Sequence, residues 1–206
     1  MIPGGLWEDA MTPYRFWVVS GLADGLARRG HVPVLIERPI RPCSWAEEVP
    51  RVLAALDRPS VLFAGSNGCS VAALAAIAEP VLVKHVIFGW PATAGDLEVD
   101  ARTRAELAAL GATEATSERL LNGQTLRGVA DREFVALPMP MPMPISVLPS
   151  RPTNTRHQQL TVDRLVELGA SELRGCPEPP LPDFAPFLAD VVHDVAKIID
   201  AAGADR

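Results

Sequence analysis

The chain alternates short, mostly apolar runs with segments whose apolar residues recur at helical spacing. Apolar runs at 32–36, 60–64, 81–89, 145–148 and 170–173 predict strands buried on both faces of a sheet. Helical periodicity fills other segments, at 13–29, 44–56, 67–78, 158–168 and 184–202. Strands that alternate with helices predict right-handed βαβ units. The expected fold class is therefore α/β, with a mainly parallel sheet of about six strands flanked by helices.

The pattern changes between residues 90 and 144. After a loop, short helices are predicted at 101–110, 114–121, 125–129 and 131–137, with no strand between them. This all-helical insertion spans about 91–137. Alternating proline and methionine at 138–144 favours an extended conformation, which predicts a stiff lead-in to the next strand. The alternative is a docking ligand for a proline-binding partner.

One transition from strand to helix carries candidate chemistry. The strand predicted at 60–64 is followed almost at once by Ser66 and an alanine-rich helical run. Ala64 and Gly68 lie two residues on either side of Ser66, where a sharp turn needs small side chains. This is the pattern of a nucleophile elbow, which exposes a serine between a strand and a helix. The alternative is a serine that caps the helix of an ordinary α/β fold.

With this motif the whole chain resembles a small, N-terminally shortened α/β-hydrolase that begins at the strand before the oxyanion loop, as a single domain over 1–206. Pro3-Gly4-Gly5-Leu6 is similar to the His-Gly-Gly-type oxyanion loop, with proline in place of histidine. The resemblance places the helical insertion at the position of a lid. It also implies an oxyanion hole formed by the backbone N–H groups of Gly5 and Asn67, with the N–H of Leu6 as an alternative donor.

Two apolar residues are candidates for contact with the substrate. Leu6 belongs to the oxyanion loop, and Trp90 follows the strand that precedes the insertion. Trp90 has an alternative role as a tryptophan packed in the core.

The partners of Ser66 are atypical for this family. The family pattern places an acid after the strand at 145–148 and a histidine after the strand at 170–173. Here the first loop holds His157 and no carboxylate, whereas the second holds Glu178 and Asp183 and no histidine. The sequence therefore predicts an atypical triad.

Three interpretations of this inversion stay open. In a rearranged triad, Ser66 is the nucleophile, His157 the general base, and Glu178 or Asp183 orients the imidazole. Asp96, which follows the strand ending near residue 89, is a further candidate for the acid. In a non-hydrolytic enzyme such as a cyclase, dehydratase or other lyase or isomerase of secondary metabolism, His157 or Glu178 acts as the acid–base group. In the third interpretation the protein is catalytically inactive and binds a ligand.

Composition narrows the partners and the location. With 19 Lys+Arg against 25 Asp+Glu in 206 residues, the net charge of -6 argues against a nucleic-acid partner. No apolar run approaches the ~20 residues of a membrane helix, and the N-terminus has no signal-peptide pattern. The cysteines, Cys43, Cys69 and Cys176, match no zinc spacing and favour reduced thiols in the cytosol. Richness in alanine, arginine and proline is typical of GC-rich bacterial genomes.

The predicted function is hydrolysis of an ester, thioester or lactone of a small apolar molecule by Ser66. No metal is expected because the histidines lie far apart, and no cofactor because phosphate-binding glycine motifs are missing. The expected partner is a small-molecule substrate, with neither nucleic acid nor membrane, and the sequence leaves a homodimer open.

Overall fold

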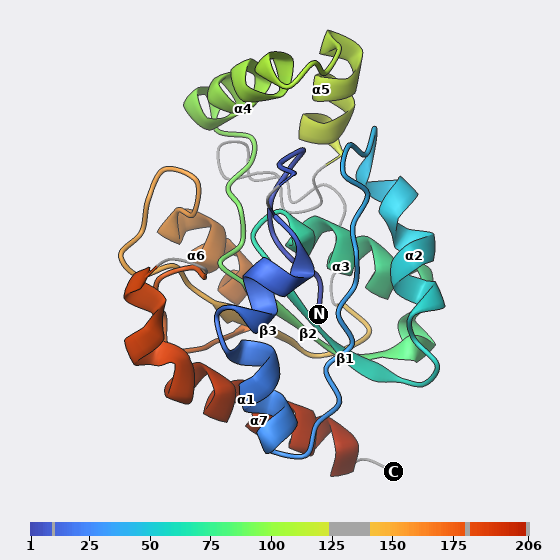
Figure 1. Ribbon diagram of the computed structural model, residues 1–206, viewed down its shortest axis with the longest axis vertical. Helices are drawn as coiled ribbons and strands as arrows, with labels where there is room; N and C mark the ends of the chain where they lie inside the picture. Colours follow the sequence, from blue (N-terminus) through green and yellow to red (C-terminus); the bar gives the residue numbers. More distant parts are fainter. Residues whose placement is uncertain (10, 124–140, 180–181, 205–206) are drawn as a thin grey trace.

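The computed structural model describes residues 1–9, 11–123, 141–179 and 182–204 (Figure 1). Within these residues four parallel strands form one sheet in the order β1-β2-β3-β4. They are β1 (Ser60–Gly65), β2 (Val83–Gly89), β3 (Ile145–Leu148) and β4 (Ser171–Glu172). The predicted α/β class and parallel sheet are confirmed, but the predicted number of strands is wrong.

The strand predicted at 32–36 does not form, for a reason that the hydrogen bonds show. The amino group of Met1 donates to Val34 O at 2.6 Å, and Ile36 N–H donates to Met1 O at 3.1 Å. Ile2 in turn makes a single parallel bridge to Ala64 at the free edge of β1. Beyond β1 the sheet is therefore extended by isolated backbone contacts of one or two residues and not by a further strand. Such contacts are too few for a strand ladder, and Pro33 has no N–H to add to them.

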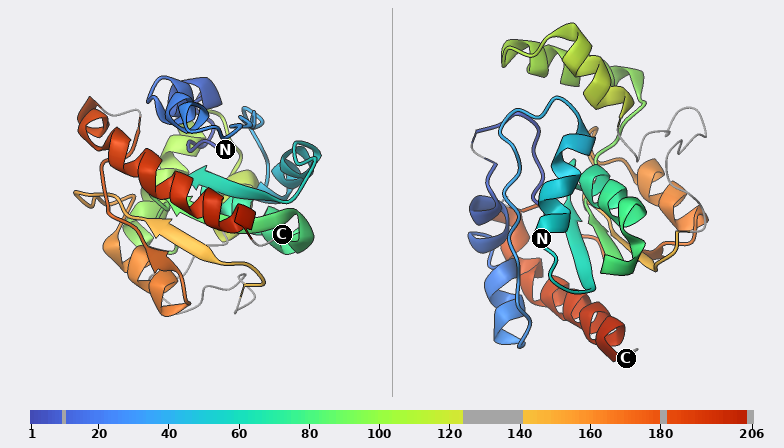
Figure 2. Two further views of the ribbon diagram at one scale, coloured as in Figure 1. Left: turned by 90° about the horizontal axis from the view of Figure 1, so that it is seen from below. Right: turned by 90° about the vertical axis from the view of Figure 1, so that its right-hand side faces the viewer.

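Helices cover both faces of the sheet, which is why its strands read as apolar runs (Figure 2). One face packs against α2 (Val49–Ala54), α3 (Gly68–Ala78) and α6 (Gln159–Glu167), and the other against α1 (Leu22–Arg28) and α7 (Leu188–Ala204). Side chains alternate accordingly along β1: Leu62 and Ala64 belong to the first core cluster, and Phe63 belongs to the second. No helix in the described ranges has the length and hydropathy needed to cross a membrane.

Several predicted helices are shorter than expected or are divided. The predicted helix at 13–29 is a π-helix, η1 (Tyr14–Val18), followed by α1, because Gly21 takes a φ of 82° that interrupts it. The 3-10 helices η2 (Trp45–Glu48) and η4 (Pro182–Phe187) precede α2 and α7. A third, η3 (Pro80–Leu82), comes before β2.

The insertion between β2 and β3 is helical where it is described. It contains α4 (Leu97–Ala109) and α5 (Glu114–Asn122), which form a layer at the top of Figure 1, apart from the sheet. The helices predicted at 125–129 and 131–137 lie outside the described residues, as does 138–140. The remainder of the Pro-Met segment alternates buried Met141 and Met143 with exposed prolines, which fits an extended lead-in to β3.

Candidate active site

Ser66 lies in the turn between β1, which ends at Gly65, and α3, which begins at Gly68. Its φ of 47° is in the left-handed region, which few non-glycine residues adopt and which costs about 1–3 kcal/mol. The Ser66 N–H donates to Gly89 O at the end of β2 at 2.9 Å. The turn therefore has the strand, tight turn and helix of the predicted elbow, and it fixes the serine at the carboxyl end of the sheet.

The glycine-rich segment at 3–6 packs directly against this turn. A Cβ on Gly4 would lie 2.9 Å from the Cβ of Ser66, and a Cβ on Gly68 would lie 2.5 Å from the Pro3 carbonyl oxygen. Gly5 adopts a φ of 87°, which glycine takes without strain. Small residues are thus required on both sides of the contact, and the predicted oxyanion loop lies beside Ser66.

His157 and Glu178 converge on Ser66 from the loops after β3 and β4. His157 Nε2 lies 3.0 Å from Ser66 Oγ, and Glu178 Oε2 lies 3.4 Å from the same Nε2. His157 is 7% exposed. These three side chains, far apart in sequence, form one polar cluster at the end of the sheet.

The other two candidate acids do not reach this cluster. Asp183 is exposed in the first turn of η4. Asp96 caps α4, where its Oδ1 accepts hydrogen bonds from the N–H groups of Glu98 and Val99, both at 3.0 Å. Neither residue therefore supplies the supporting acid that was predicted at its position. Asp96 caps α4, and Asp183 is exposed to solvent.

The cluster differs from a Ser-His-Asp triad in where the acid stands. In such a triad the acid accepts a hydrogen bond from Nδ1 and so fixes the tautomer of the histidine. Here Glu178 stands at Nε2, on the same side of the ring as Ser66. His157 Nδ1 is buried and has no hydrogen-bond partner among the described residues. The rearranged triad predicts that Glu178 or Asp183 orients the imidazole. Glu178 does not do so through Nδ1, the ring nitrogen that faces away from Ser66.

Burial shifts the pKa values of the two groups in opposite directions. It lowers the pKa of His157 to about 4, with the charge of Arg156 adding to the effect. It raises the pKa of Glu178 to about 8, and the charge of Glu8 adds to this, whereas the Ser66 hydroxyl and Arg156 oppose it. Between these values His157 is a neutral imidazole and Glu178 is a protonated carboxyl group, so neither side chain carries a charge.

Ser66, His157 and Glu178 open into a cavity of about 480 Å³. Gly5, Leu6 and Asn67 line the same cavity. The oxyanion role predicted for Gly5 and Asn67 and the substrate contact predicted for Leu6 stay predictions. Its apolar wall includes residues of the insertion: Val99, Leu107, Leu110 and Leu121. A mostly apolar space therefore lies beside Ser66.

Trp90 does not line this cavity, so its predicted contact with substrate is wrong. The residue is fully buried in the core between Phe16, Phe63 and Phe184. Its indole N–H donates to Cys176 O at 3.0 Å. The alternative prediction of a core tryptophan describes what the structure shows.

Trp90→Phe should therefore act on stability and not on the site. Loss of the indole volume and of its hydrogen bond should lower the free energy of unfolding by about 1–2 kcal/mol. Urea unfolding measures this loss, and activity per folded molecule should stay at the wild-type level. A large fall in activity of the folded variant would contradict a purely structural role.

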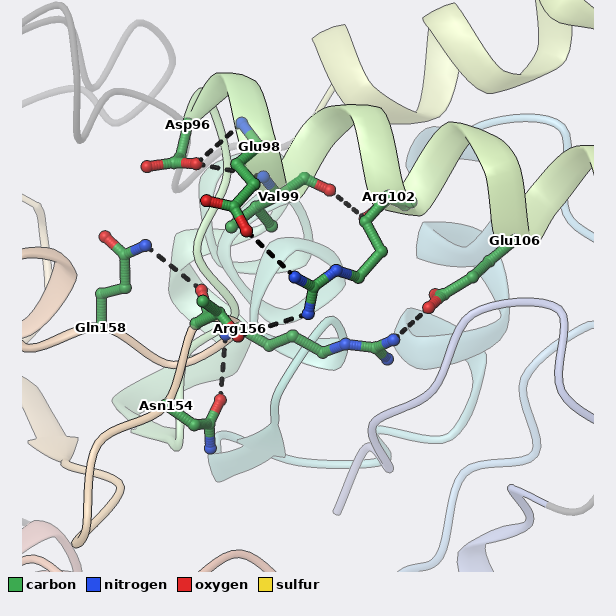
Figure 3. Close-up of polar contacts among 10 residues, drawn as sticks. Asp96, Glu98, Val99, Arg102, Glu106, Asn154, Arg156 and Gln158 are labelled. Carbon is green, nitrogen blue, oxygen red and sulfur yellow. Dashed lines mark hydrogen bonds and ion pairs between the residues drawn. The ribbon is translucent and has the colours of Figure 1, made fainter.

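A polar network ties the His157 loop to α4 (Figure 3). Arg156 forms an ion pair with Glu106, and Arg102 contacts Thr155 at 3.4 Å. Asn154 Oδ1 accepts hydrogen bonds from the N–H groups of Arg156 and His157, at 2.9 and 3.1 Å. The network holds His157 in place. Sequence reasoning missed it because charged residues on a helix such as α4 usually face solvent.

The described residues contain no group of three His, Cys, Asp or Glu side chains that could hold a metal ion.

No protein-family model matches the chain, and a search of curated proteins gives no match. Solved structures are similar to it over nearly its full length. Mouse alpha/beta hydrolase domain-containing protein 10 is 13% identical, covers 97% of this chain and 88% of its own, and has a TM-score of 0.65. An extracellular alpha/beta-hydrolase from a Paenibacillus species is 14% identical, covers 95% and 96%, and has a TM-score of 0.63. NosK from Streptomyces actuosus is 20% identical, covers 97% of both chains, and has a TM-score of 0.58.

The chain has the α/β-hydrolase fold. The resemblance inferred from the Ser66 motif is thus confirmed at the level of fold. In the usual chain order of this fold the acid precedes the histidine, whereas here His157 precedes Glu178.

Proposed function

We propose that this protein is a serine hydrolase that cleaves an ester, thioester or lactone of a small, largely apolar molecule. The observation that carries the proposal is the 3.0 Å approach of Ser66 Oγ to His157 Nε2 inside the apolar-walled cavity. A nucleophile held on a strained turn, beside acid–base groups and glycine-loop amides, is suited to acyl transfer. The helices α4 and α5 act as the lid of this cavity, and the free cysteines favour a cytosolic enzyme.

The tautomer of His157 decides how the proton of Ser66 leaves. A proton on Nε2 is within reach of Ser66 Oγ and Glu178, whereas a proton on Nδ1 meets no acceptor among the described residues. A buried donor without an acceptor costs about 1–3 kcal/mol, so the proton belongs on Nε2. His157 then donates to Ser66 Oγ, and Glu178, in its carboxylate form, accepts the serine proton.

The reaction follows from this assignment. Ser66 Oγ attacks the carbonyl carbon as its proton moves to Glu178, and the N–H groups of Gly5 and Asn67 stabilise the oxyanion. Collapse breaks the bond to the leaving oxygen or sulfur, which takes the proton from Glu178. Water then attacks the acyl-enzyme, and Glu178 accepts the water proton and returns it to Ser66. The acid product leaves with a free carboxyl group.

Labelling with a fluorophosphonate probe tests the nucleophile. The folded wild type should be labelled on Ser66, as located by mass spectrometry of the labelled peptide, and Ser66→Ala should stay unlabelled. Hydrolysis of short aryl esters should be lost in the same variant. A folded wild-type protein that takes no label would contradict the proposal.

Two further variants test the proton route. His157→Gln keeps an N–H donor that can face Ser66, so we expect it to retain more activity than Glu178→Gln, which loses the proton acceptor. The order of the two kcat values measures this directly. If His157 is the general base instead, the order is reversed.

A further inference from the structure

Arg38 holds the glycine-rich loop through its backbone carbonyl groups. Its Nη1 donates to the carbonyl oxygens of Pro3, Gly4 and Gly5, at 3.1, 3.1 and 2.8 Å. One guanidinium nitrogen thus binds three successive carbonyl groups. The Arg38 side chain is 9% exposed.

The Arg38 guanidinium is itself held by two further side chains, Glu48 and Trp45. Its Nε and Nη2 form a two-point ion pair with Glu48, at 2.7 and 3.0 Å, and the Glu48 side chain is 1% exposed. The guanidinium also lies 5.6 Å from the ring centroid of Trp45, which is buried. Because a guanidinium is planar and rigid, fixing two of its nitrogens fixes the third.

Peptide geometry links these contacts to the site. In a trans peptide the C=O of one residue and the N–H of the next point in opposite directions. Carbonyl groups of residues 3–5 that face Arg38 therefore turn the N–H groups of Gly4, Gly5 and Leu6 away from it. For Gly5 and Leu6 that direction is toward the cavity, because both residues line it beside Ser66.

We propose that Arg38, fixed by Glu48, is a positioning residue that aims the N–H groups of the 3–6 loop at the oxyanion formed by Ser66 chemistry. The inference rests on the proposed hydrolase function. The five contacts need the three nitrogens of one planar guanidinium in fixed positions, so lysine, with a single ammonium nitrogen, cannot replace it. Substrate binding in the ground state does not depend on these amides as strongly as the transition state does, so Arg38 acts on kcat more than on KM.

The test must separate positioning from the stability of a buried ion pair. Removing Arg38 alone leaves the Glu48 charge buried and unpaired, which can unfold the protein. The double variant Arg38→Met/Glu48→Leu removes both charges at similar volume, and such replacements are usually tolerated. Arg51→Met is the matched control, since Arg51 is exposed and its Nη1 donates to Glu37 O at 3.4 Å, away from the 3–6 loop.

We expect the double variant to keep the wild-type circular dichroism spectrum and melt cooperatively, with KM for an aryl ester within a few-fold of wild type. Its kcat and its rate of fluorophosphonate labelling should fall by about 10²–10³-fold, the usual effect of losing an oxyanion donor. In Arg38→Ala, added guanidinium ion at a non-denaturing concentration should restore part of kcat, and sodium chloride at equal ionic strength should not. Arg51→Met should match the wild type.

The outcomes also separate this inference from the proposed function. Wild-type labelling at Ser66 together with unchanged kcat in the folded double variant would overturn the role of Arg38 alone. If the wild type takes no label, the proposed function fails. Amide hydrogen exchange then tests whether Arg38 positions the 3–6 loop. Exchange at Gly4, Gly5 and Leu6 should be faster in the double variant, and unchanged exchange there overturns the inference.

Discussion

Glu178→Gln is expected to lower kcat by about 10²–10⁴-fold, the range for loss of a general base, while making the protein more stable above neutral pH. Glutamine fills the same space beside Ser66 and His157 but cannot accept the serine proton. In the wild type, kcat/KM should rise with pH through about 8, because burial raises the pKa of Glu178 to about 8 and only its carboxylate is a base. This rise should be missing in the variant.

The gain in stability follows from the same raised pKa. Above its ordinary value of 4.5, Glu178 has lost its proton in the unfolded chain but keeps it in the folded protein up to about 8. The folded state then binds more protons, so Glu178 lowers the free energy of unfolding by about 1.4 kcal/mol per pH unit. Between pH 6.5 and 8 the variant should therefore gain about 2 kcal/mol relative to wild type.

The difference between variant and wild type must be measured, since other groups titrate too. Burial lowers the pKa of the Met1 amino group from 8.0 to about 5, which raises stability over the same range in both proteins and cancels in the difference. His157, with its pKa lowered from 6.5 to about 4, contributes a slope mainly below pH 6.5. Urea unfolding at several pH values from 6.5 to 8 gives the difference.

The same substitution at an exposed carboxylate, Glu167→Gln on α6, is the control and should change neither kcat nor the slope. A Glu178→Gln protein with wild-type kcat would show that Glu178 is not the base. A stability difference that is constant from pH 6.5 to 8 would show that its carboxyl titrates normally in the folded protein.

The sequence predicts the Ser66 turn well because its determinants are local. A strand, a helix and small residues at 64 and 68 are enough to identify it. The same holds for β1, α3 and α5, whose bounds agree with the predicted ranges within about two residues. The strand at 32–36 fails because forming it depends on a partner strand, and among the described residues its hydrogen bonds toward the sheet run to Met1.

The sequence predicts the three side chains that meet at the site, Ser66, His157 and Glu178, but not the geometry in which they meet. His157 and Glu178 can be found from the loops that follow two strands, since such loops meet at one edge of a parallel sheet. Their common approach to Nε2 depends on loop conformations held by Asn154 and by the α4 network, which no local pattern encodes. Arg38 escapes detection for a related reason, because its partners are carbonyl groups that every sequence has.

Trp90 shows the limit of reasoning from position alone. It follows β2 at the carboxyl edge of the sheet, where ligands bind, but a φ of 48° and three aromatic neighbours place its side chain in the core. A strand end fixes where the backbone lies, and tertiary packing decides on which side of it a large side chain is buried.

Gly68→Ala should impair both folding and catalysis, although alanine is normally the better residue in a helix. Gly68 is the first residue of α3, where the substitution alone would stabilise by about 0.5–1 kcal/mol. Its new Cβ would lie 2.5 Å from Pro3 O and 3.1 Å from both Ile2 O and Ile2 Cγ2. Because the nearest of these atoms is backbone, the loop at 2–6 must move, at a cost of about 1–3 kcal/mol.

That movement shifts the loop amides relative to Ser66, and a displacement of about 1 Å can cost about 10²-fold in rate. We therefore expect Gly68→Ala to lower kcat by about this factor, in addition to its lower midpoint in urea. Gly203→Ala in α7 is the matched control: it is also a helical glycine, but a Cβ there meets no atom within 4 Å, so it should lose neither stability nor activity. If Gly68→Ala behaves like this control, the loop does not pack on the turn as closely as the 2.5 Å contact requires, and the role of Gly68 reduces to helix propensity. If Gly68→Ala loses stability and activity while Gly203→Ala does not, glycine is needed at position 68 so that the oxyanion loop can pack against the turn. This requirement differs from the tightness of the turn, which is the reason that the sequence gives for a small residue there.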